Sequence, residues 1–375
     1  MMKWTCPLVL FALLVMAGCS ASRDESSIEF ASLSEDEKRL PENALASMTV
    51  SEGMEVQLFA AEPMITNPTN ISVDHLGRVW VCEAYNYDVS PEEEDSKGDR
   101  IVVLEDTDHN GVADKRTVFY QGTDINTPLG IFVTGTKVYV SRSPNVFVFE
   151  DNNGDLVPDK KEVLFTNLGR KGDHSAHSVF GGPDGKLYFS TGNSAGEIKD
   201  KDGNPILDRA GLEVSQKGNP YLGGMIMRFD EHGKNLEVLG HNFRNNYEPC
   251  IDSYGNVWQS DNDDDGNESC RINFVMPYGN YGFLDEFTKA TWTTNRVGLE
   301  EEVSRRHWHQ DDPGVVHNIL ITGAGSPAGM TVYEGNELAK EFYGMPIHAE
   351  PYYNVVRGYL SKAAGAGGHC MSCPF

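Results

Sequence analysis

Apolar and polar residues alternate in short runs along most of this chain, which is the period of a β-strand with one buried face. Four segments share one pattern, in which a strand, a turn with Gly or Thr and a second strand with an aromatic residue follow one another. The aromatic residues are Trp80, Tyr139, Tyr188 and Trp258, at spacings of 59, 49 and 70 residues. A further strand type follows at 101–106, 146–151 and 225–230, with a late copy at 330–334. Two hairpins in each period predict a blade of four antiparallel strands.

A recurrence of whole hairpin pairs over a long period is typical of a β-propeller. At ~50 residues per period, residues 48–362 predict one all-β domain, a six-bladed β-propeller with four strands in each blade. The alternative, a β-sandwich, does not explain such a recurrence. Outside residues 19–47, we expect an amphipathic helix only around 300–306.

The N-terminal residues have the pattern of an export signal. An apolar run follows Lys3 and ends in Ala17-Gly18-Cys19, which resembles a bacterial lipobox, where the Cys is acylated and becomes the first mature residue. We therefore predict a lipoprotein signal peptide over 1–18, lipidation at Cys19, and a periplasmic or cell-surface location. The alternative is a plain signal peptide with an incidental Cys. Polar residues 19–47 are expected to form a flexible tether, and Gly-rich residues 363–375 an unstructured tail, as in a truncated product.

Composition narrows the classes of partner. The 31 Lys and Arg against 56 Asp and Glu give a formal charge of −25, which phosphate backbones and anionic headgroups repel. Nucleic-acid binding is disfavoured, and membrane attachment is expected through the lipid anchor alone. An oxidising compartment permits one disulfide among Cys82, Cys250 and Cys270, but their spacing does not select a pair.

Three acidic loops have the oxygen ligands that a hard cation prefers. The loops that begin at Asp106 and Asp151 resemble the first part of a calcium loop, and a hairpin turn capped by its own side chains is an equal alternative for both. The third loop holds Asp261, Asp263 and Asp265 among five acids in eight residues. Because this charge density is repulsive without a cation, we predict that these three residues bind calcium.

Three stretches resemble a known family. They are 173–193, which begins Asp173-His174-Ser-Ala-His177, contains Gly-Pro-Asp and ends at Asn193; Gly240-His-Asn-Phe-Arg244-Asn245; and 259–282 with its Asn-Tyr-Gly turn. They are similar to the soluble quinoprotein glucose and aldose sugar dehydrogenases, six-bladed propellers that use pyrroloquinoline quinone and calcium. The resemblance implies that His174 is the catalytic base, that Arg244 and Asn245 contact the quinone, and that the third acidic loop bears the metal. Asn246 stands where the family usually has Pro.

Other motifs resemble a planctomycete-type group of membrane-bound dehydrogenases more closely. They are Leu58-Phe-Ala-Ala-Glu-Pro63, Gly77-Arg-Val-Trp80, His307-Trp-His-Gln-Asp-Asp-Pro-Gly314 and Thr322-Gly-Ala-Gly-Ser-Pro-Ala-Gly329. Full-length members usually continue into a c-type haem domain. Here Cys370-Met-Ser-Cys373 lacks the His that must follow to ligate haem iron, so no haem is expected in this chain.

Two functions from different classes follow. The first is an exported, lipid-anchored dehydrogenase that oxidises a sugar or related alcohol with pyrroloquinoline quinone and calcium and passes electrons to a partner such as a cytochrome. In it His174 accepts the hydroxyl proton, and Asp173 orients His174 if the chain turns back sharply. The second is a non-catalytic, calcium-stabilised propeller that binds glycans or a protein at the cell surface, with loop histidines solvating the channel rim. A lactonase-type hydrolase and a transition-metal site at His174 and His177 are weaker alternatives.

Overall fold

The computed structural model describes residues 30–364 and 367–374, apart from 91, 171, 219, 297, 324, 326 and 327, with the backbone alone from 361 onward. The signal peptide and Cys19 therefore lie outside the described residues. The chain divides into two compact units, Met1–Met48 and Thr49–Phe375. Among the described residues, no helix is long and apolar enough to cross a membrane.

The described part of the first unit is helical where the sequence predicted a tether. It contains α1 (Glu35–Lys38), α2 (Pro41–Ala44) and the 3₁₀ turns η1 (Phe30–Ser32) and η2 (Leu45–Ser47). A capping box starts α1, because the Ser34 hydroxyl accepts from the N–H of Glu37 while the Glu37 carboxylate accepts from the N–H of Ser34. Local capping explains these short helices. They are too short to show the helical spacing of apolar residues from which a helix is predicted.

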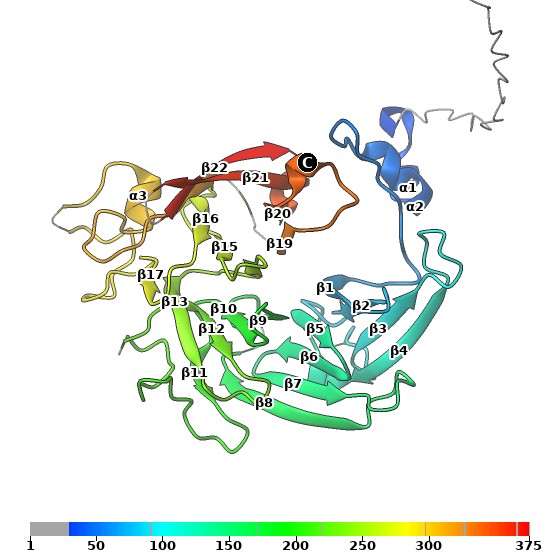
Figure 1. Ribbon diagram of the computed structural model, residues 1–375, viewed down its shortest axis with the longest axis horizontal. Coiled ribbons are helices and arrows are strands. Elements are labelled where there is room, and N and C mark those ends of the chain that lie inside the picture. The colour runs from blue at the N-terminus through cyan, green and yellow to red at the C-terminus, as the bar shows by residue number, and fades with distance from the viewer. Residues whose placement is uncertain are drawn as a thin grey trace, which may run out of the picture. The chain divides into compact units, whose positions relative to one another are not determined.

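The second unit is built from antiparallel sheets that follow one another in chain order around a common centre (Figure 1). The first sheet holds β1 (Pro68–Val73), β2 (Val79–Glu83), β3 (Asp99–Glu105) and β4 (Lys115–Gly122). The second holds β5 (Gly130–Thr134), β6 (Lys137–Arg142), β7 (Asn145–Glu150), β8 (Lys160–Leu168) and β11 (Gly196–Lys199). The third holds β9 (Ala176–Gly181), β10 (Leu187–Thr191), β12 (Gly224–Phe229), β13 (Glu237–Phe243) and β17 (Gly279–Asn280).

The remaining two sheets complete the described unit. The fourth sheet holds β14 (Cys250–Ile251), β15 (Val257–Asp261), β16 (Cys270–Phe274) and β18 (Leu320–Gly323). The fifth holds β19 (Met330–Tyr333), β20 (Met345–Glu350), β21 (Val355–Ala364) and β22 (Gly367–Pro374). The helix predicted near 300–306 is present as α3 (Val303–His307), and η3 (Thr123–Ile125), η4 (Lys340–Phe342) and η5 (Pro351–Tyr353) are single turns.

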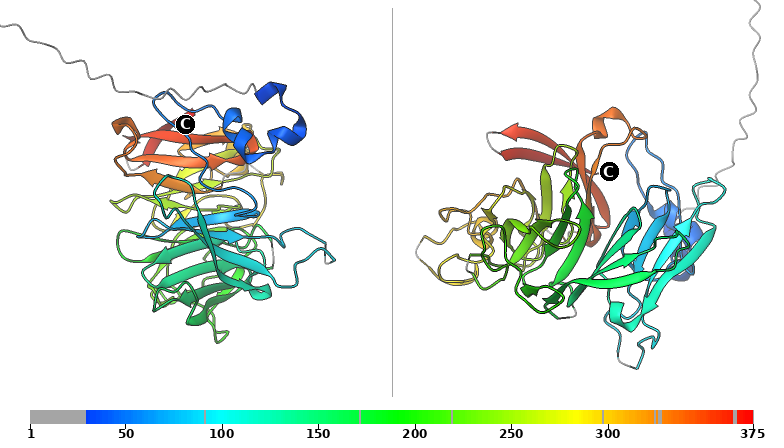
Figure 2. Two further views of the ribbon diagram at one scale, coloured as in Figure 1. Left: turned by 90° about the vertical axis from the view of Figure 1, so that its right-hand side faces the viewer. Right: turned by 60° about the horizontal axis from the view of Figure 1, so that its bottom comes forward.

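The all-β propeller is confirmed, but the prediction of six four-stranded blades is wrong. The described residues form five sheets of four or five strands, which can be followed by colour from cyan to red in Figure 2. Connections without strands consume the length assigned to the sixth blade, above all the stretch between β17 and β18, which contains only α3. The fifth strands are short additions: β11 pairs with β8, and β17 pairs in parallel with β13. The tail predicted to lack structure contributes β22, which pairs along β21.

Each recurring aromatic residue lies on the second strand of its sheet, as the pattern predicted. They are Trp80, Tyr139, Tyr188 and Trp258, on β2, β6, β10 and β15, and none is more than 8% exposed. Strands are buried on both faces where two sheets meet, which is why all five residues of β10 are buried. The cysteines Cys82, Cys250 and Cys270 are buried and free.

Candidate functional site

The hairpin of β9 and β10 brings His174 beside Asn193. Ala176 pairs with Thr191, and the same register continued two residues beyond the strands sets His174 opposite Asn193. There Nδ1 of His174 lies 2.7 Å from Oδ1 of Asn193. Because a carbonyl oxygen only accepts, Nδ1 carries the proton and Nε2 keeps a lone pair. His174 is half-buried and lines a cavity of about 580 Å³ together with Arg170, Asp173 and Ser194.

The segment of Arg244 and Asn245 meets this hairpin end. The N–H of Asn193 donates to the carbonyl of Arg244 at 2.8 Å. A Cβ added to Gly192 would lie 2.5 Å from Oδ1 of Asn245 and 2.7 Å from the carbonyl oxygen of His174, so only glycine permits this approach. The structure thus brings His174, Arg244 and Asn245 together although 70 residues separate the first two in the chain.

His177 ties the two segments to each other. Its ring is fully buried, with Nδ1 2.6 Å from the carbonyl oxygen of Asn246 and Nε2 2.9 Å from that of Asp173. Burial lowers the pKa of this imidazole. Because both nitrogens face backbone carbonyls in a fully buried position, His177 does not take part in the transition-metal site that its spacing from His174 suggested.

Asn193, rather than Asp173, is the side chain that holds Nδ1 of His174. Asp173 is exposed, and it contributes its backbone carbonyl to His177 instead. Sequence reasoning missed Asn193, although it ends one of the stretches that resemble the quinoprotein family. The signal that finds it is the antiparallel register, which pairs the residues just before β9 with those just after β10.

The side chain of Arg244 points into a cluster that the sequence also left unassigned. Its Nη1 donates to Oδ1 of Asn262 at 2.9 Å, and its Nε lies 3.6 Å from Oδ2 of Asp264. Asp264 further accepts from Nε1 of Trp292 at 2.8 Å and lies 2.7 Å from Nε2 of His307. The hydrogen bond from His307, above all, lowers the pKa of Asp264 to about 2. His307 itself is fully buried.

The structure does not gather Asp261, Asp263 and Asp265 into a metal-binding group. The Asp261 carboxylate accepts from the backbone N–H groups of Arg244 and Asn245 and from Nη2 of Arg271. Asp263 accepts from the N–H of Ser269, and Asp265 from its hydroxyl. Burial raises the pKa of Asp263 to about 6. Oδ1 of Asp263 is buried without a hydrogen-bond partner among the described residues. Because the guanidinium of Arg271 and two backbone N–H groups already occupy Asp261, the donor set does not fit calcium.

The acidic side chains that do converge belong to the first loop. Oxygens of Asp106, Asp108 and Asp114 lie within 4.8 Å of one another, and this is the group of metal-ligand type among the described residues. Asp108 and Asp114 are exposed. Asp106 accepts from the N–H of Gly111 at 2.7 Å, which is also the contact expected of a capped hairpin turn. The two alternatives for this loop therefore both remain open.

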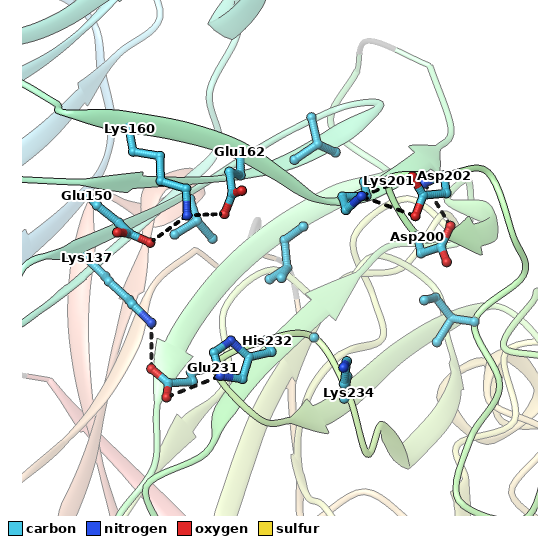
Figure 3. Close-up of a pocket in the computed structure, with 15 residues that line it drawn as sticks. Lys137, Glu150, Lys160, Glu162, Asp200, Lys201, Asp202, Glu231, His232 and Lys234 are labelled. Carbon is cyan, nitrogen blue, oxygen red and sulfur yellow. Dashed lines mark hydrogen bonds and ion pairs between the residues drawn. The ribbon is translucent and has the colours of Figure 1, made fainter.

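A second cavity, of about 540 Å³, lies over β7 and β8 and holds none of the predicted site residues (Figure 3). Its charges pair among themselves: Nζ of Lys160 lies 2.8 Å from Glu162, and Nζ of Lys137 lies 2.6 Å from Glu231. Exposed pairs of this kind contribute about 0–1 kcal/mol each. Four lysines against five carboxylates are close to balance and offer a ligand no strong charge of either sign, so we do not assign a site here.

Solved structures of sugar dehydrogenases share the fold. The pyrroloquinoline-quinone-bound aldose sugar dehydrogenase of Streptomyces coelicolor is 15% identical, with a TM-score of 0.55 over 83% of this chain and 81% of that one. The holo quinone domain of pyranose dehydrogenase from Coprinopsis cinerea is 15% identical, with a TM-score of 0.53 over 83% and 78%. A calcium structure of the carbohydrate-active family AA12 from Trichoderma reesei is 15% identical, with a TM-score of 0.53 over 86% of each chain. At this identity the likeness establishes the propeller fold.

No curated protein matches the sequence. A family model described as "Domain of unknown function (DUF7133)" matches residues 40–369, which is most of the chain. The chain therefore belongs to the DUF7133 family.

Proposed function

We propose that this chain is a dehydrogenase that oxidises a sugar or a related alcohol with pyrroloquinoline quinone as cofactor. The observation that carries the proposal is the convergence of His174, Asn193, Arg244 and Asn245 beside the cavity that His174 lines. The shared fold supports it, since one similar structure is a quinone-bound sugar dehydrogenase and another is a holo quinone domain.

The side chains of Arg244 and Asn245 fit the quinone. The side chain of Arg244 is 15% exposed, and a guanidinium is the donor best suited to a cofactor carboxylate. Oδ1 of Asn245 is buried without a hydrogen-bond partner among the described residues, so this amide has a polar atom unused within the protein. Arg244 and Asn245 would hold the quinone, and the quinone would accept the hydride from the substrate carbon.

His174 is set up to take the substrate's hydroxyl proton. Since Asn193 holds the proton on Nδ1, the lone pair on Nε2 is available as the base. When Nε2 becomes protonated, the same Asn193 oxygen stabilises the imidazolium through its contact with Nδ1. The alcohol would lose one proton to His174 and one hydride to the quinone, and it would leave as the carbonyl compound.

Calcium is not assigned to residues 261–265 in this proposal, because their donor set does not fit it. Export, lipidation at Cys19 and a cytochrome as natural electron acceptor remain parts of the proposal that rest on the sequence alone. The lipidation site lies outside the described residues.

Reconstitution tests the proposed function. We expect the purified chain to bind pyrroloquinoline quinone and then to reduce an artificial acceptor with at least one of a panel of aldoses and sugar alcohols. Arg244→Ala should weaken quinone binding, whereas the control Arg209→Ala, at a side chain that is 62% exposed and pairs with Glu237, should not. If the wild-type chain binds no quinone, the non-catalytic propeller that binds glycans or a protein becomes the better account.

A further inference from the structure

We infer that the guanidinium of Arg271, on β16, supplies the positive charge that balances the acidic loop, residues 261–268. The sequence had suggested calcium for this role. The same ion pair fixes the backbone of Arg244 and Asn245, so Asp261 and Arg271 are positioning residues for the candidate site. The positioning role rests on the proposed function, whereas the charge role does not.

The Asp261 carboxylate has no free oxygen to offer a metal. Oδ1 accepts from the backbone N–H of Asn245 at 2.8 Å and from that of Arg244 at 3.2 Å. Oδ2 accepts from Nη2 of Arg271 at 2.9 Å, and both side chains of this pair are fully buried. A cation that entered here would have to displace these donors, which would then be buried without partners.

Strand pairing and an aromatic ring hold Arg271 in place. Asp261 on β15 and Arg271 on β16 are direct partners in the antiparallel register, so the two side chains leave the same face of the sheet. The guanidinium carbon lies 3.5 Å from the centre of a Trp308 ring, a cation–π contact between two fully buried side chains. Nε and Nη1 of Arg271 have no hydrogen-bond partner among the described residues, so Asp261 and the rings around it account for this buried charge.

Donors within the protein also serve the other aspartates of the loop. Ser269 donates its N–H to Asp263 and its hydroxyl to Asp265. Asp264 accepts a hydrogen bond from Nε1 of Trp292 and contacts His307. Oδ1 of Asp263 alone among these oxygens is buried without a hydrogen-bond partner in the described part of the chain. Apart from it, the dense negative charge that suggested a metal is balanced by Arg271, by Arg244 beside Asp264, and by hydrogen-bond donors.

The ion pair connects the buried ring of Trp308 to the site. Trp308 supports Arg271, Arg271 orients Asp261, and Asp261 holds the peptide N–H groups at 244 and 245. The N–H of Asn193 donates a hydrogen bond to the carbonyl of Arg244. The peptide that presents Arg244 and Asn245 is thus fixed at both its N–H and C=O groups.

Thermal unfolding with calcium or with a chelator tests the charge role. We use Asp108→Asn as the background, which removes a ligand from the separate group at Asp106, Asp108 and Asp114. In this background we expect Tm to be the same, within about 1 °C, in millimolar calcium and in excess chelator. A calcium-dependent rise in Tm that persists in Asp108→Asn and is lost on adding Asp265→Asn would overturn the inference.

Charge neutralisation provides the second arm. Arg271→Gln leaves the buried carboxylate of Asp261 without a counter-charge and should lower Tm by roughly 5–15 °C. The double variant Asp261→Asn/Arg271→Gln, whose pair is neutral, should recover most of that loss. If Arg271→Gln does not fold, a folded double variant still supports the pairing. A double variant that is unfolded, or no more stable than Arg271→Gln, overturns it.

Quinone binding tests the positioning role. The folded double variant should bind pyrroloquinoline quinone about tenfold more weakly than wild type, because the peptide of Arg244 and Asn245 is less firmly held. Arg271→Lys, which keeps the charge, should bind it more tightly than the double variant. Unchanged binding in the double variant would refute positioning. If wild type binds no quinone, the proposed function fails while the Tm experiments still decide the charge role.

Discussion

The proton on Nδ1 of His174 determines what its other nitrogen can do. Asn193 keeps that proton in place through its side-chain oxygen and, through its backbone N–H, binds the carbonyl of Arg244. A single residue therefore sets both the tautomer of the base and its alignment with the cofactor residues. The chemistry of the candidate site depends on a side chain that is itself inert.

Replacing Asn193 should damage turnover without removing the base. We expect Asn193→Ala to lower kcat of the quinone-loaded enzyme by about 10-fold to 100-fold, less than the ~10²–10⁴ associated with loss of a general base. Steady-state kinetics measure this change. Asn204→Ala, at an exposed turn, is the matched control and should leave kcat unchanged. An Asn193→Ala enzyme with wild-type kcat would remove Asn193 from the account.

The carboxyl group of Glu248 should make the stability of the protein depend on pH. Its carboxylate accepts from Nδ2 of Asn70 at 2.6 Å, and burial raises its pKa to about 7, above the value near 4.5 expected for the unfolded chain. A pKa raised by folding adds stability that is fully present below about pH 4.5 and is lost as the pH rises through 7. Glu248→Gln should therefore be more stable than wild type at pH 8, by on the order of 1–3 kcal/mol after discounting for partial exposure.

Urea unfolding at pH 8 and pH 5 measures this difference. The advantage of Glu248→Gln should shrink toward pH 5, where wild-type Glu248 is protonated in the folded protein. Exposed Glu55→Gln should show no such trend. A variant whose stability relative to wild type is the same at both pH values would contradict the raised pKa.

At the scale of the elements, the strand β10 shows why sheets that face one another are sensitive to truncation. Phe189 on β10 is fully buried and lies with Phe165 at a ring-centroid distance of 6.3 Å. Phe189→Ala should cost about 3–5 kcal/mol of unfolding free energy, because the cavity left in a packed core cannot fully collapse. Phe287→Ala, at a side chain that is 89% exposed, should change stability by less than about 0.5 kcal/mol. Equal costs would contradict this core.

Strand identities could be predicted from the sequence, but the number of blades could not. Alternation and recurring aromatics located β2, β6, β10 and β15, since burial of one face is a local property of the chain. Counting blades needs the lengths of the connections, and a loop without strands, such as the one that carries α3, has no period to reveal it. Dividing length by period therefore counted one blade too many.

The candidate site, like the fold, could be predicted from the sequence only in part. His174, Arg244 and Asn245 could be proposed from the sequence because the motifs that resemble the quinoprotein family are short and contiguous, and the structure brings these residues together. The roles of Asn193 and Arg271 depend on strand register, which no local motif contains. Asp261 was predicted as a calcium ligand because a carboxylate that binds a metal and one that accepts N–H donors are the same residue type in a sequence.

At the scale of the whole molecule, the charge of −25 leaves the lipid as the expected means of membrane attachment. Cys19→Ser should move the protein from the membrane fraction to the soluble exported fraction, because acylation needs the thiol. Fractionation with labelled fatty acid measures both effects, and Cys82→Ser, at a buried free cysteine, is the control. A Cys19→Ser protein that stays in the membrane, with no lipid label on wild type, would contradict the anchor.

The central claim is that His174 is the base of a quinone-dependent oxidation. The most direct measurement is the turnover of wild type and His174→Ala, both loaded with pyrroloquinoline quinone, on the aldose that wild type uses best. The account predicts that His174→Ala binds the quinone and melts like wild type but turns over about 10²–10⁴ times more slowly. Wild-type turnover in a folded, quinone-loaded His174→Ala protein would contradict it.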